Sequence, residues 1–265
     1  MKGVILAGGT GSRLYPLTKV TNKHLLPVYD RPMIYYPLMT LLKSGIDDIL
    51  IVSGIGHAGD FLELLSDGSA FLDDIRRLDG PGAFDGVNLK LSYAIQADAG
   101  GIAEALALAQ DFSDNEPIAV ILGDNVLMDN ITPGLRKFLD RGHGAFVFLK
   151  EVNNPQSYGI AEIKNDKIIK IHEKPADPPS PLAVAGIYFY DNQVWDIIKH
   201  LTPSARGELE ITDVNNAYIE RDDIGYEIIQ GWWGDGGESF DSLLEAGNLI
   251  ANSRSKTVFH TYSSE

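Results

Sequence analysis

Short apolar runs alternate with helical patterns along the first half of the chain. Runs typical of buried strands lie at 2–6, 48–53, 89–93 and 117–122. Apolar residues with helical spacing lie at about 33–43, 60–65 and 102–110. This alternation predicts an α/β fold with a Rossmann-like, mostly parallel sheet that carries helices on both faces. Ligands of such sheets bind beyond the carboxyl ends of the strands, so the segments after the strands are the candidate binding regions.

The pattern changes after residue 145. Two apolar runs, 159–163 and 167–171, flank a turn-forming Lys-Asn-Asp-Lys segment and predict a β-hairpin. We therefore expect one domain over residues 1–265, with halves at about 1–145 and 146–253 and a fraying tail at 254–265. The Gly- and Asp-rich segment Ser66 to Asn88 is expected to be an inserted surface loop with a short helical stretch at 71–78.

Composition narrows the possible functions. The 265 residues carry 22 Lys and Arg against 37 Asp and Glu, a net charge of −15, which disfavours nucleic acid and anionic membranes as partners. No apolar run approaches the roughly 20 residues of a membrane span. The absence of cysteine excludes disulfides and thiolate sites and fits a cytoplasmic location. A small phosphorylated ligand remains possible, because a few focused cations and backbone amides can bind it.

The first candidate site is the glycine-rich turn LAGGTGSRLYP after the first predicted strand. Backbone amides around Gly8, Gly9 and Gly11 can converge on phosphate oxygens, and Arg13 adds a forked cationic donor. The dinucleotide fingerprint fails because Leu14 stands where glycine is required, and the Gly-Lys-Ser/Thr of a Walker loop is absent. The alternative is a purely structural turn.

Charged side chains near other strand ends could complete such a site. Lys23 could serve the same polyphosphate as Arg13, and both cations are expected to be exposed. Asp124 follows an apolar strand and Asp235 lies among glycines, so the two carboxylates could share one Mg²⁺. The alternatives are a solvated lysine and an aspartate in an Asx turn or helix cap; His24 is expected to be a satisfied imidazole.

Two further segments carry an acid beside a cation. Glu173 and Lys174 end the predicted hairpin, where a carboxylate could bind sugar hydroxyls and an ammonium could bind phosphate. Arg206 could add a phosphate contact. An exposed strand end and an ordinary helix start are the alternatives, and the spacing does not decide between them.

The motifs occur in the order seen in the sugar-1-phosphate nucleotidylyltransferase family, which the chain resembles from Lys2 to about Asn252. They are LAGGTGSRLYP, NKHLLPV, RPMIYYPL, LGDN, YGIAEI, EKP, GIYFYD, SARGELEITDVN and WWGDGG. The resemblance implies a nucleotide-binding half at 1–145 and a sugar-phosphate-binding half at 146–253. It implies catalytic roles for Arg13 and Lys23, and Mg²⁺ as the cofactor held by Asp124 and Asp235. It implies nucleotide contacts by Leu6, Gly8, Gly9, Gly11, Gln96, Gly101 and Asp124, and sugar-phosphate contacts by Tyr158, Gly159, Glu173, Lys174, Val184 and Arg206.

Within the family, the closest resemblance is to members that join dTTP to glucose 1-phosphate, giving dTDP-glucose and pyrophosphate. UTP or another sugar 1-phosphate is the near alternative, because one methyl group separates substrates by only about 1–3 kcal/mol. A non-catalytic sugar-nucleotide sensor and a dinucleotide-dependent oxidoreductase are further alternatives. The resemblance also implies a homo-oligomer, in a short form that lacks the C-terminal accessory helices of longer members.

Overall fold

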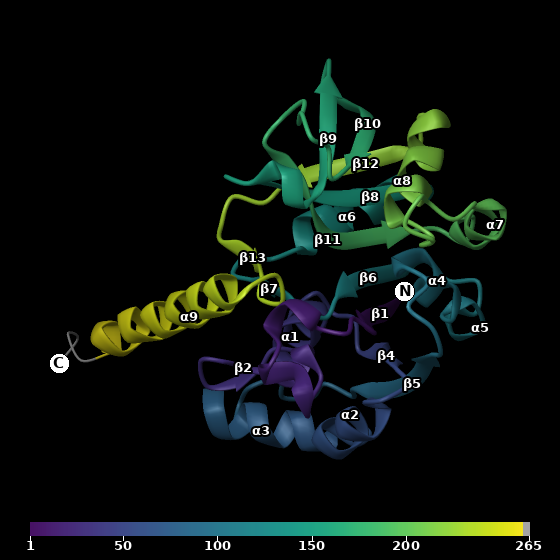
Figure 1. Cartoon of the computed structure of the whole chain (residues 1–265). Coiled ribbons are helices and arrows are strands. Elements are labelled where there is room, and N and C mark those ends of the chain that lie inside the picture. The colour runs from purple at the N-terminus through teal and green to yellow at the C-terminus, as the bar shows by residue number, and fades with distance from the viewer. Residues whose placement is uncertain (262–265) are drawn as a thin grey trace.

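The computed structural model describes the backbone of residues 1–261 and the side chains of residues 1–254. The first half alternates strands with helices as predicted (Figure 1). Its elements are β1 (Lys2–Ala7), η1 (Ser12–Leu14), η2 (Leu17–Lys19), η3 (Lys23–Leu25), β2 (Pro27–Val28), β3 (Arg31–Pro32), α1 (Tyr35–Lys43), β4 (Asp48–Gly54), α2 (Ala58–Leu65), α3 (Ser69–Asp79), β5 (Lys90–Gln96), α4 (Ile102–Ala107), α5 (Gln110–Ser113), β6 (Ile118–Leu122), β7 (Asn125–Leu127) and α6 (Thr132–Arg141).

The second half contains more strand than helix. Its elements are β8 (Ala145–Glu151), η4 (Pro155–Ser157), β9 (Gly159–Lys164), β10 (Lys167–Glu173), β11 (Leu182–Tyr190), α7 (Val194–His200), α8 (Ile211–Glu220), β12 (Ile224–Ile228), β13 (Trp233–Asp235) and α9 (Phe240–Thr261). The predicted hairpin is confirmed as antiparallel β9 and β10. Asn165 and Asp166 between them have φ values of 51° and 57°, as a tight hairpin turn requires.

One nine-stranded sheet runs through both halves in the order β10-β9-β11-β6-β1-β4-β5, with β8 beside β11 and β12 beside β8. The strands β6, β1, β4 and β5 are parallel, as are β8 and β12, which confirms the predicted α/β fold. Strands β9, β10 and β11 add antiparallel pairings. Because β11 pairs directly with β6, the hairpin region is joined to the Rossmann-like region within a single sheet.

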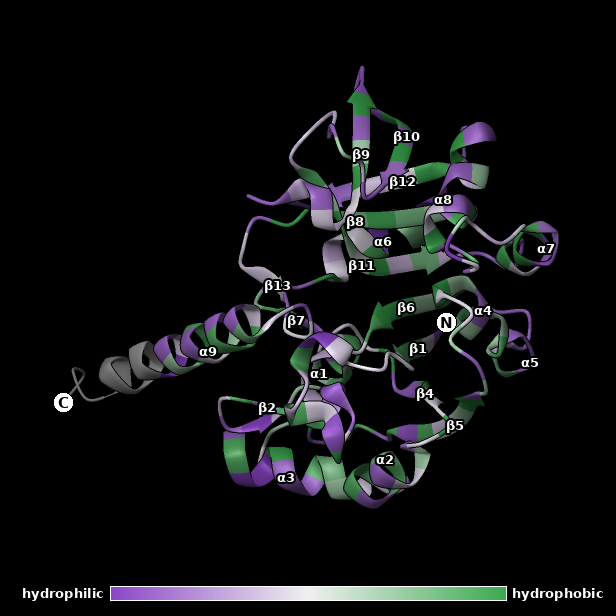
Figure 2. Ribbon diagram, viewed as in Figure 1, coloured by the Kyte–Doolittle hydropathy of each residue, from purple (hydrophilic) through white to green (hydrophobic). Residues whose placement is uncertain are grey.

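Helices cover both faces of this sheet. Successive residues of β1 point to opposite faces, so Ile5 packs in the core beneath α1, α2 and α3, whereas Val4 packs in the core beneath α4, α7 and α8. After Lys2, strand β1 is therefore apolar and buried on both faces, as is typical of a central parallel strand. Figure 2 shows the same hydrophobic character along β6 and β8. No helix within residues 1–261 is both long enough and apolar enough to cross a bilayer.

One expectation from the sequence is wrong. The segment Ser66 to Asn88 is not merely a surface loop: α3 buries Phe71, Leu72 and Ile75, and Phe71 packs edge-to-face on Tyr35 at a centroid distance of 4.9 Å. The fraying of the tail at 254–265 stays a prediction: α9 continues to Thr261, and the last four residues, 262–265, lie outside the described residues.

Candidate active site

The glycine-rich turn leaves β1 and packs closely against its neighbours. Gly11 has φ +64°, and a Cβ atom there would lie 2.8 Å from Thr18 Cγ2. A Cβ atom on Gly8 would lie 2.8 Å from Oε1 of Gln96, which ends β5. Leu14 in η1 is fully buried and anchors the loop. Glycine is needed at position 11 because a side chain there would collide with Thr18 and strain the backbone, whereas a side chain at position 8 would displace the end of Gln96.

A cavity of about 290 Å³, here called the loop cavity, lies along this turn and the carboxyl ends of β1 and β6. It is lined by Leu6, Gly8, Gly9, Thr10, Lys23, His24, Gln96, Ala99, Gly101, Ile102, Ala105, Leu122, Asp124 and Glu208. All predicted nucleotide contacts except Gly11 therefore surround one cavity. Gly11 shapes the turn instead of lining it.

A second cavity of about 160 Å³, here called the hairpin cavity, lies against the β9–β10 hairpin and β11. It is lined by Arg13, Ile102, Leu122, Asn125, Ser157, Tyr158, Gly159, Glu173, Lys174, Val184, Gly186, Tyr188, Ile211, Thr212, Asn215, Trp233, Asp235 and Glu238. Five of the six predicted sugar-phosphate contacts line it. The loop and hairpin cavities share Ile102 and Leu122, so the two cavities adjoin.

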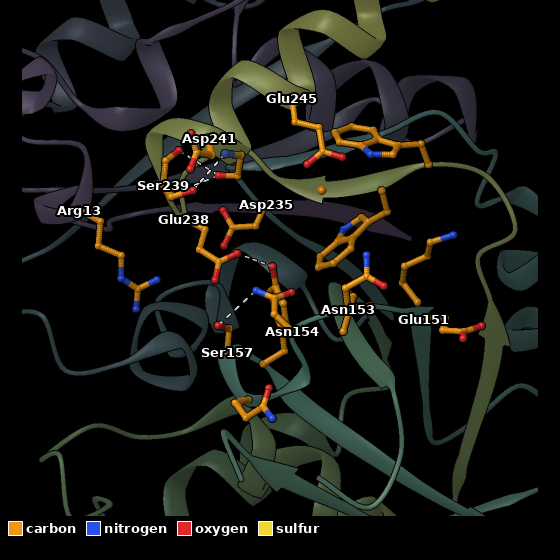
Figure 3. Close-up of a pocket in the computed structure, with 18 of the residues that line it drawn as sticks. Arg13, Glu151, Asn153, Asn154, Ser157, Asp235, Glu238, Ser239, Asp241 and Glu245 are labelled. Carbon is orange, nitrogen blue, oxygen red and sulfur yellow. Dashed lines mark hydrogen bonds between the residues drawn. The ribbon is translucent and has the colours of Figure 1, made fainter. Parts of the chain in front are cut away.

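The hairpin cavity opens into a larger outer cavity of about 770 Å³, drawn in Figure 3. Both are lined by Arg13, Ser157, Tyr158, Lys174, Trp233, Asp235 and Glu238. Figure 3 shows the side chains of Arg13, Asp235 and Glu238 directed toward the interior of this space. The hairpin cavity is therefore reached from outside past two cations, Arg13 and Lys174, and two carboxylates, Asp235 and Glu238.

Lys23, Asp124 and Asp235 form a buried charged cluster where the cavities meet. Asp124 lines the loop cavity and Asp235 lines the hairpin cavity. The ammonium of Lys23 donates a hydrogen bond to Asp124. Strand β13 pairs with β7 so that Asp235 lies opposite Asn125, and Gly236 donates its N–H to the carbonyl oxygen of Asp124 over 2.9 Å. The expected proximity of the two distant aspartates is therefore what the structure shows.

The pKa values of the two aspartates in the cluster are shifted in opposite directions. Burial, reinforced by the charge of Asp124, raises the pKa of Asp235 to about 7. Burial would also raise the pKa of Asp124, but the neighbouring Lys23 ammonium outweighs it and holds the pKa below its ordinary value. Burial likewise disfavours charge on Lys23, and the two aspartates overcome it and raise the pKa of the ammonium. With both aspartates ionised, the cluster therefore carries one more negative than positive charge, and a bound cation would offset that excess.

These two carboxylates suit a hard divalent cation. Within the described residues, no group of three or more His, Cys, Asp or Glu side chains is arranged to hold a metal. Mg²⁺ typically uses only one or two protein carboxylates and takes its other ligands from phosphates and water. A pair of aspartates between two cavities therefore fits a metal that is bound together with a phosphorylated ligand.

His24 is a neutral imidazole in the wall of the loop cavity. It is 2% exposed, and burial, together with the Lys23 charge, lowers its pKa to about 3. Asn22 Oδ1 accepts hydrogen bonds from both the backbone N–H and, given a neutral ring, Nδ1–H of His24. The expectation of a satisfied imidazole is confirmed at Nδ1.

Three predicted cations lie in surroundings that the sequence did not indicate. Arg13 is exposed, as expected, but lines the hairpin and outer cavities rather than the loop cavity. Lys23 was expected to be exposed, and this is wrong because its side chain is 15% exposed and paired with Asp124. Arg206 lines none of the three cavities; its guanidinium contacts Glu173 and Glu210 beside the hairpin cavity.

Several polar residues of the site were not predicted. Glu238 accepts a hydrogen bond from the hydroxyl of Tyr158, and Asn125 accepts one from the indole of Trp233. Thr212 donates to Oε2 of Glu173 over 2.6 Å. Asn125, Trp233 and Glu238 directly adjoin or flank the aspartates in LGDN and WWGDGGE, so their sequence proximity was the available signal.

Comparison with known proteins identifies the class. The sequence model of the family described as nucleotidyl transferase matches residues 2–253, and the chain belongs to this family. A glucose-1-phosphate thymidylyltransferase of Neisseria meningitidis is 41% identical over 94% of this chain and 82% of its own length. The enzyme of the same name from Xanthomonas campestris is 44% identical over 94% of this chain and 80% of its own length.

Solved structures agree with the fold. A candidate glucose-1-phosphate thymidylyltransferase from Bacillus anthracis, crystallised with sucrose, matches with a TM-score of 0.83 at 48% identity, covering 94% of each chain. A UDP-glucose pyrophosphorylase complexed with UDP-glucose also gives a TM-score of 0.83, covering 95% of this chain and 98% of its own, but is 24% identical. The second likeness concerns the fold alone.

Proposed function

We propose that this protein transfers a thymidylyl group from dTTP to glucose 1-phosphate, which yields dTDP-glucose and pyrophosphate. The observation that carries this assignment is the buried Lys23–Asp124–Asp235 cluster at the meeting point of two cavities. Membership of the nucleotidyl transferase family supports the reaction class. The thymidylyltransferases that are 41–44% identical over 94% of this chain support the choice of substrates.

The reaction joins two anions and needs little covalent chemistry from the protein. A phosphate oxygen of glucose 1-phosphate attacks the α-phosphorus of dTTP, and the bond to the bridging oxygen of pyrophosphate breaks. Because the nucleophile is already ionised, no general base is required. The protein's task is to hold the two substrates in line and to neutralise the charge that develops.

We assign dTTP to the loop cavity. The backbone of the turn at Gly8 and Gly9 faces this cavity and would bind phosphate oxygens, as converging N–H groups do elsewhere. Gln96 and Gly101 would contact the base, and the Gln96 amide is held by a 3.3 Å hydrogen bond to the carbonyl oxygen of Gly101. Leu6 would supply apolar contact. Lys23, which lines the same cavity, would stabilise charge at the α-phosphate.

We assign glucose 1-phosphate to the hairpin cavity. Glu173 would accept hydrogen bonds from sugar hydroxyls, with Tyr158, Gly159 and Val184 forming the remaining wall. Lys174, which follows β10, would bind the phosphate. Arg206 would approach the phosphate from beside the cavity. Arg13 lines the passage to the outer cavity and would bind the departing pyrophosphate.

We assign Mg²⁺ to Asp124 and Asp235. When bound, the metal would neutralise phosphate charge and thereby help the attack at phosphorus. The raised pKa of Asp235 means that its carboxyl group must release a proton before it can bind a cation near neutral pH. Lys23 pairs with Asp124 in this structure, so substrate and metal must share or replace that contact.

We retain the division into a nucleotide-binding half at 1–145 and a sugar-phosphate-binding half at 146–253 as a proposal. It is supported by the loop cavity, which draws nearly all of its lining from the first half. The hairpin cavity draws most of its lining from the second half. Assembly into a homo-oligomer and a cytoplasmic location stay predictions.

Parallel turnover measurements with dTTP and UTP test the substrate assignment. Purified protein is given Mg²⁺ and glucose 1-phosphate, and pyrophosphate release and the nucleotide sugar are both quantified. The proposal predicts formation of dTDP-glucose with a kcat/KM for dTTP about tenfold or more above that for UTP. Equal efficiencies would remove the thymidylyl assignment, and nucleotide binding without pyrophosphate release would indicate a sensor.

A further inference from the structure

Arg206 is held beside the hairpin cavity by carboxylates from three positions. Its Nη2 lies 2.9 Å from each carboxylate oxygen of Glu210 and 3.0 Å from Oε1 of Glu173. Its Nε donates to Glu210 over 3.2 Å, and Glu208 lies 3.7 Å away. Nη1 makes no hydrogen bond with the side chains or backbone described by the structure. The guanidinium therefore has one fixed edge and one open end.

Glu210 is the fixed point of this arrangement. It is 8% exposed and immediately precedes α8, whereas the Arg206 side chain is 43% exposed. Ser204 donates its hydroxyl to Glu210 over 2.7 Å and accepts the backbone N–H of Arg206 over 3.2 Å. Glu210 is thus the more buried partner of the pair, and Ser204 holds it independently of the arginine.

The turn that carries these residues is also joined to the loop cavity. Leu209 donates its N–H to Gly100 over 2.8 Å and accepts the N–H of Ala103 over 3.1 Å. These two hydrogen bonds fix the backbone next to Glu210 against the Gly100–Gly101 segment, which lines the loop cavity at Gly101. Hydrogen bonds therefore connect the turn that carries Arg206 both to the wall of the loop cavity and to the hairpin.

Attraction of a phosphate does not explain why carboxylates surround Arg206. Glu173, Glu208 and Glu210 surround a single arginine beside a cavity that, under the proposed function, takes an anionic sugar phosphate. An additional carboxylate close to a phosphate weakens binding unless it has another role. Fixing the orientation of a flexible guanidinium is such a role, because a two-point fork contact removes most of its rotational freedom.

We propose that Glu210 is a positioning residue for sugar-phosphate binding. It holds Arg206 through Nε and Nη2, so that Nη1, which has no hydrogen-bond partner among the described residues, stays available to a phosphate. Without it, Arg206 would keep only its contacts with Glu173 and Glu208, and its guanidinium would lose the two-point contact that fixes its orientation. This inference rests on the proposed function, which assigns the hairpin cavity to glucose 1-phosphate.

The test is the variant Glu210→Gln in the full-length protein. Initial rates are measured with glucose 1-phosphate varied at saturating dTTP, and then with dTTP varied at saturating glucose 1-phosphate. We expect the KM for glucose 1-phosphate to rise about tenfold, as loss of one charge-assisted hydrogen bond predicts, with the KM for dTTP within about twofold. Glu220→Gln, the same charge change at the exposed far end of α8, should leave both values unchanged.

The opposite results overturn the inference. A lower KM for glucose 1-phosphate in Glu210→Gln would show that the acid only repels phosphate. Equal rises in both KM values with a lowered melting temperature would show a merely structural role. If Glu210→Gln does not fold, Glu210→Asp and Arg206→Lys are measured instead. Both variants are expected to raise the KM for glucose 1-phosphate without raising the KM for dTTP. The inference is overturned if either variant lacks this selective rise. Absence of transfer in the unmodified protein would contradict the proposed function, whereas normal transfer with an unchanged variant contradicts Glu210 alone.

Discussion

The loop cavity and the hairpin cavity open on the same sheet but are built differently. The loop cavity follows the carboxyl ends of parallel strands, and its wall includes the glycine turn at Gly8 and Gly9 and the close backbone approach of Gly101 to Leu209. The hairpin cavity is defined by hydrogen-bonded side chains such as Glu173 with Thr212. Backbone geometry should therefore control nucleotide binding, and side-chain hydrogen bonding should control sugar-phosphate binding. The charged cluster between them should affect both.

The largest effect is expected from Lys23→Met at the meeting point of the cavities. The variant removes the cation nearest the proposed α-phosphate, and loss of one preorganised donor typically costs about 10²–10³-fold in rate. We expect kcat to fall by that amount in a steady-state assay with saturating substrates. It also leaves two buried carboxylates without their cation, so the melting temperature without metal should fall.

Lys19→Met is the matched control for this variant. Lys19 is an exposed lysine of the same chain segment and lines none of the three cavities. It should keep both the rate and the melting temperature. Unchanged turnover in Lys23→Met would contradict the role of the cluster.

The next largest effect is expected from Gly101→Ala, which would distort the backbone that lines the loop cavity. Gly101 has φ +103°, and a Cβ atom there would lie 2.5 Å from the carbonyl oxygen of Leu209. We expect a loss of about 2 kcal/mol or more in the free energy of unfolding, measured by denaturant titration. The KM for dTTP should rise more than the KM for glucose 1-phosphate.

Gly45→Ala separates the two causes of this loss. Gly45 has φ +79°, but a Cβ atom there meets nothing within 4 Å, so it carries the backbone strain without the collision. The difference between the two variants measures the close approach to Leu209. Equal losses would show that the tight packing at Gly101 is unimportant.

A smaller effect is expected from Tyr158→Phe on the hairpin side. The substitution removes the hydroxyl that donates to Glu238 and leaves the ring, which packs on Trp233 at 5.6 Å between centroids. Loss of one such hydrogen bond costs about 1 kcal/mol, so the KM for glucose 1-phosphate should rise roughly fivefold. A change confined to the KM for dTTP would contradict the assignment of the two cavities.

The smallest effect concerns stability between pH 5 and 7 without metal. The raised pKa of Asp235, about 7, means that the folded state holds a proton that the unfolded state releases above about pH 4, so this group lowers stability as pH rises. The lowered pKa of His24, about 3, acts oppositely: the unfolded state binds the proton below about pH 6.5, so this group lowers stability as pH falls. The two contributions partly cancel.

Variants separate these opposing contributions. Asp235→Asn should make the melting temperature rise more steeply from pH 5 to 7 than in the unmodified protein. His24→Gln should make it fall over the same range. Calorimetric scans at several pH values check both, and parallel curves for all three proteins would show that neither group titrates as described.

The difference between the cavities also explains what the sequence could predict. Glycine spacing and residues at strand ends are local signals, so a binding site along the turn, and the hypothesis that Asp124 and Asp235 share one cation, could be drawn from them. The burial of Lys23 did not, because the segment around it is short and polar and its partner lies 101 positions away.

The other features that the sequence did not predict depend on contacts between residues far apart in the chain. The Gly- and Asp-rich ends of Ser66 to Asn88 obscured the apolar face of α3, whose burial depends on contact with Tyr35. Glu208 and Glu210 are near neighbours of Arg206 in sequence, whereas Glu173 ends β10, 33 positions away, and no spacing rule predicts that it meets them. The antiparallel entry of β11 beside β6 likewise depends on the whole sheet.

The most direct test of the central claim is the position of the metal in a ternary complex. Crystals grown with dTTP, a non-reacting analogue of glucose 1-phosphate and Mn²⁺ in place of Mg²⁺ would locate it by anomalous scattering. The account predicts one peak between the cavities, within about 2.0–2.3 Å of a carboxylate oxygen of both Asp124 and Asp235 and in contact with phosphate oxygens. A metal held by neither aspartate, or by one of them away from both substrates, would contradict it.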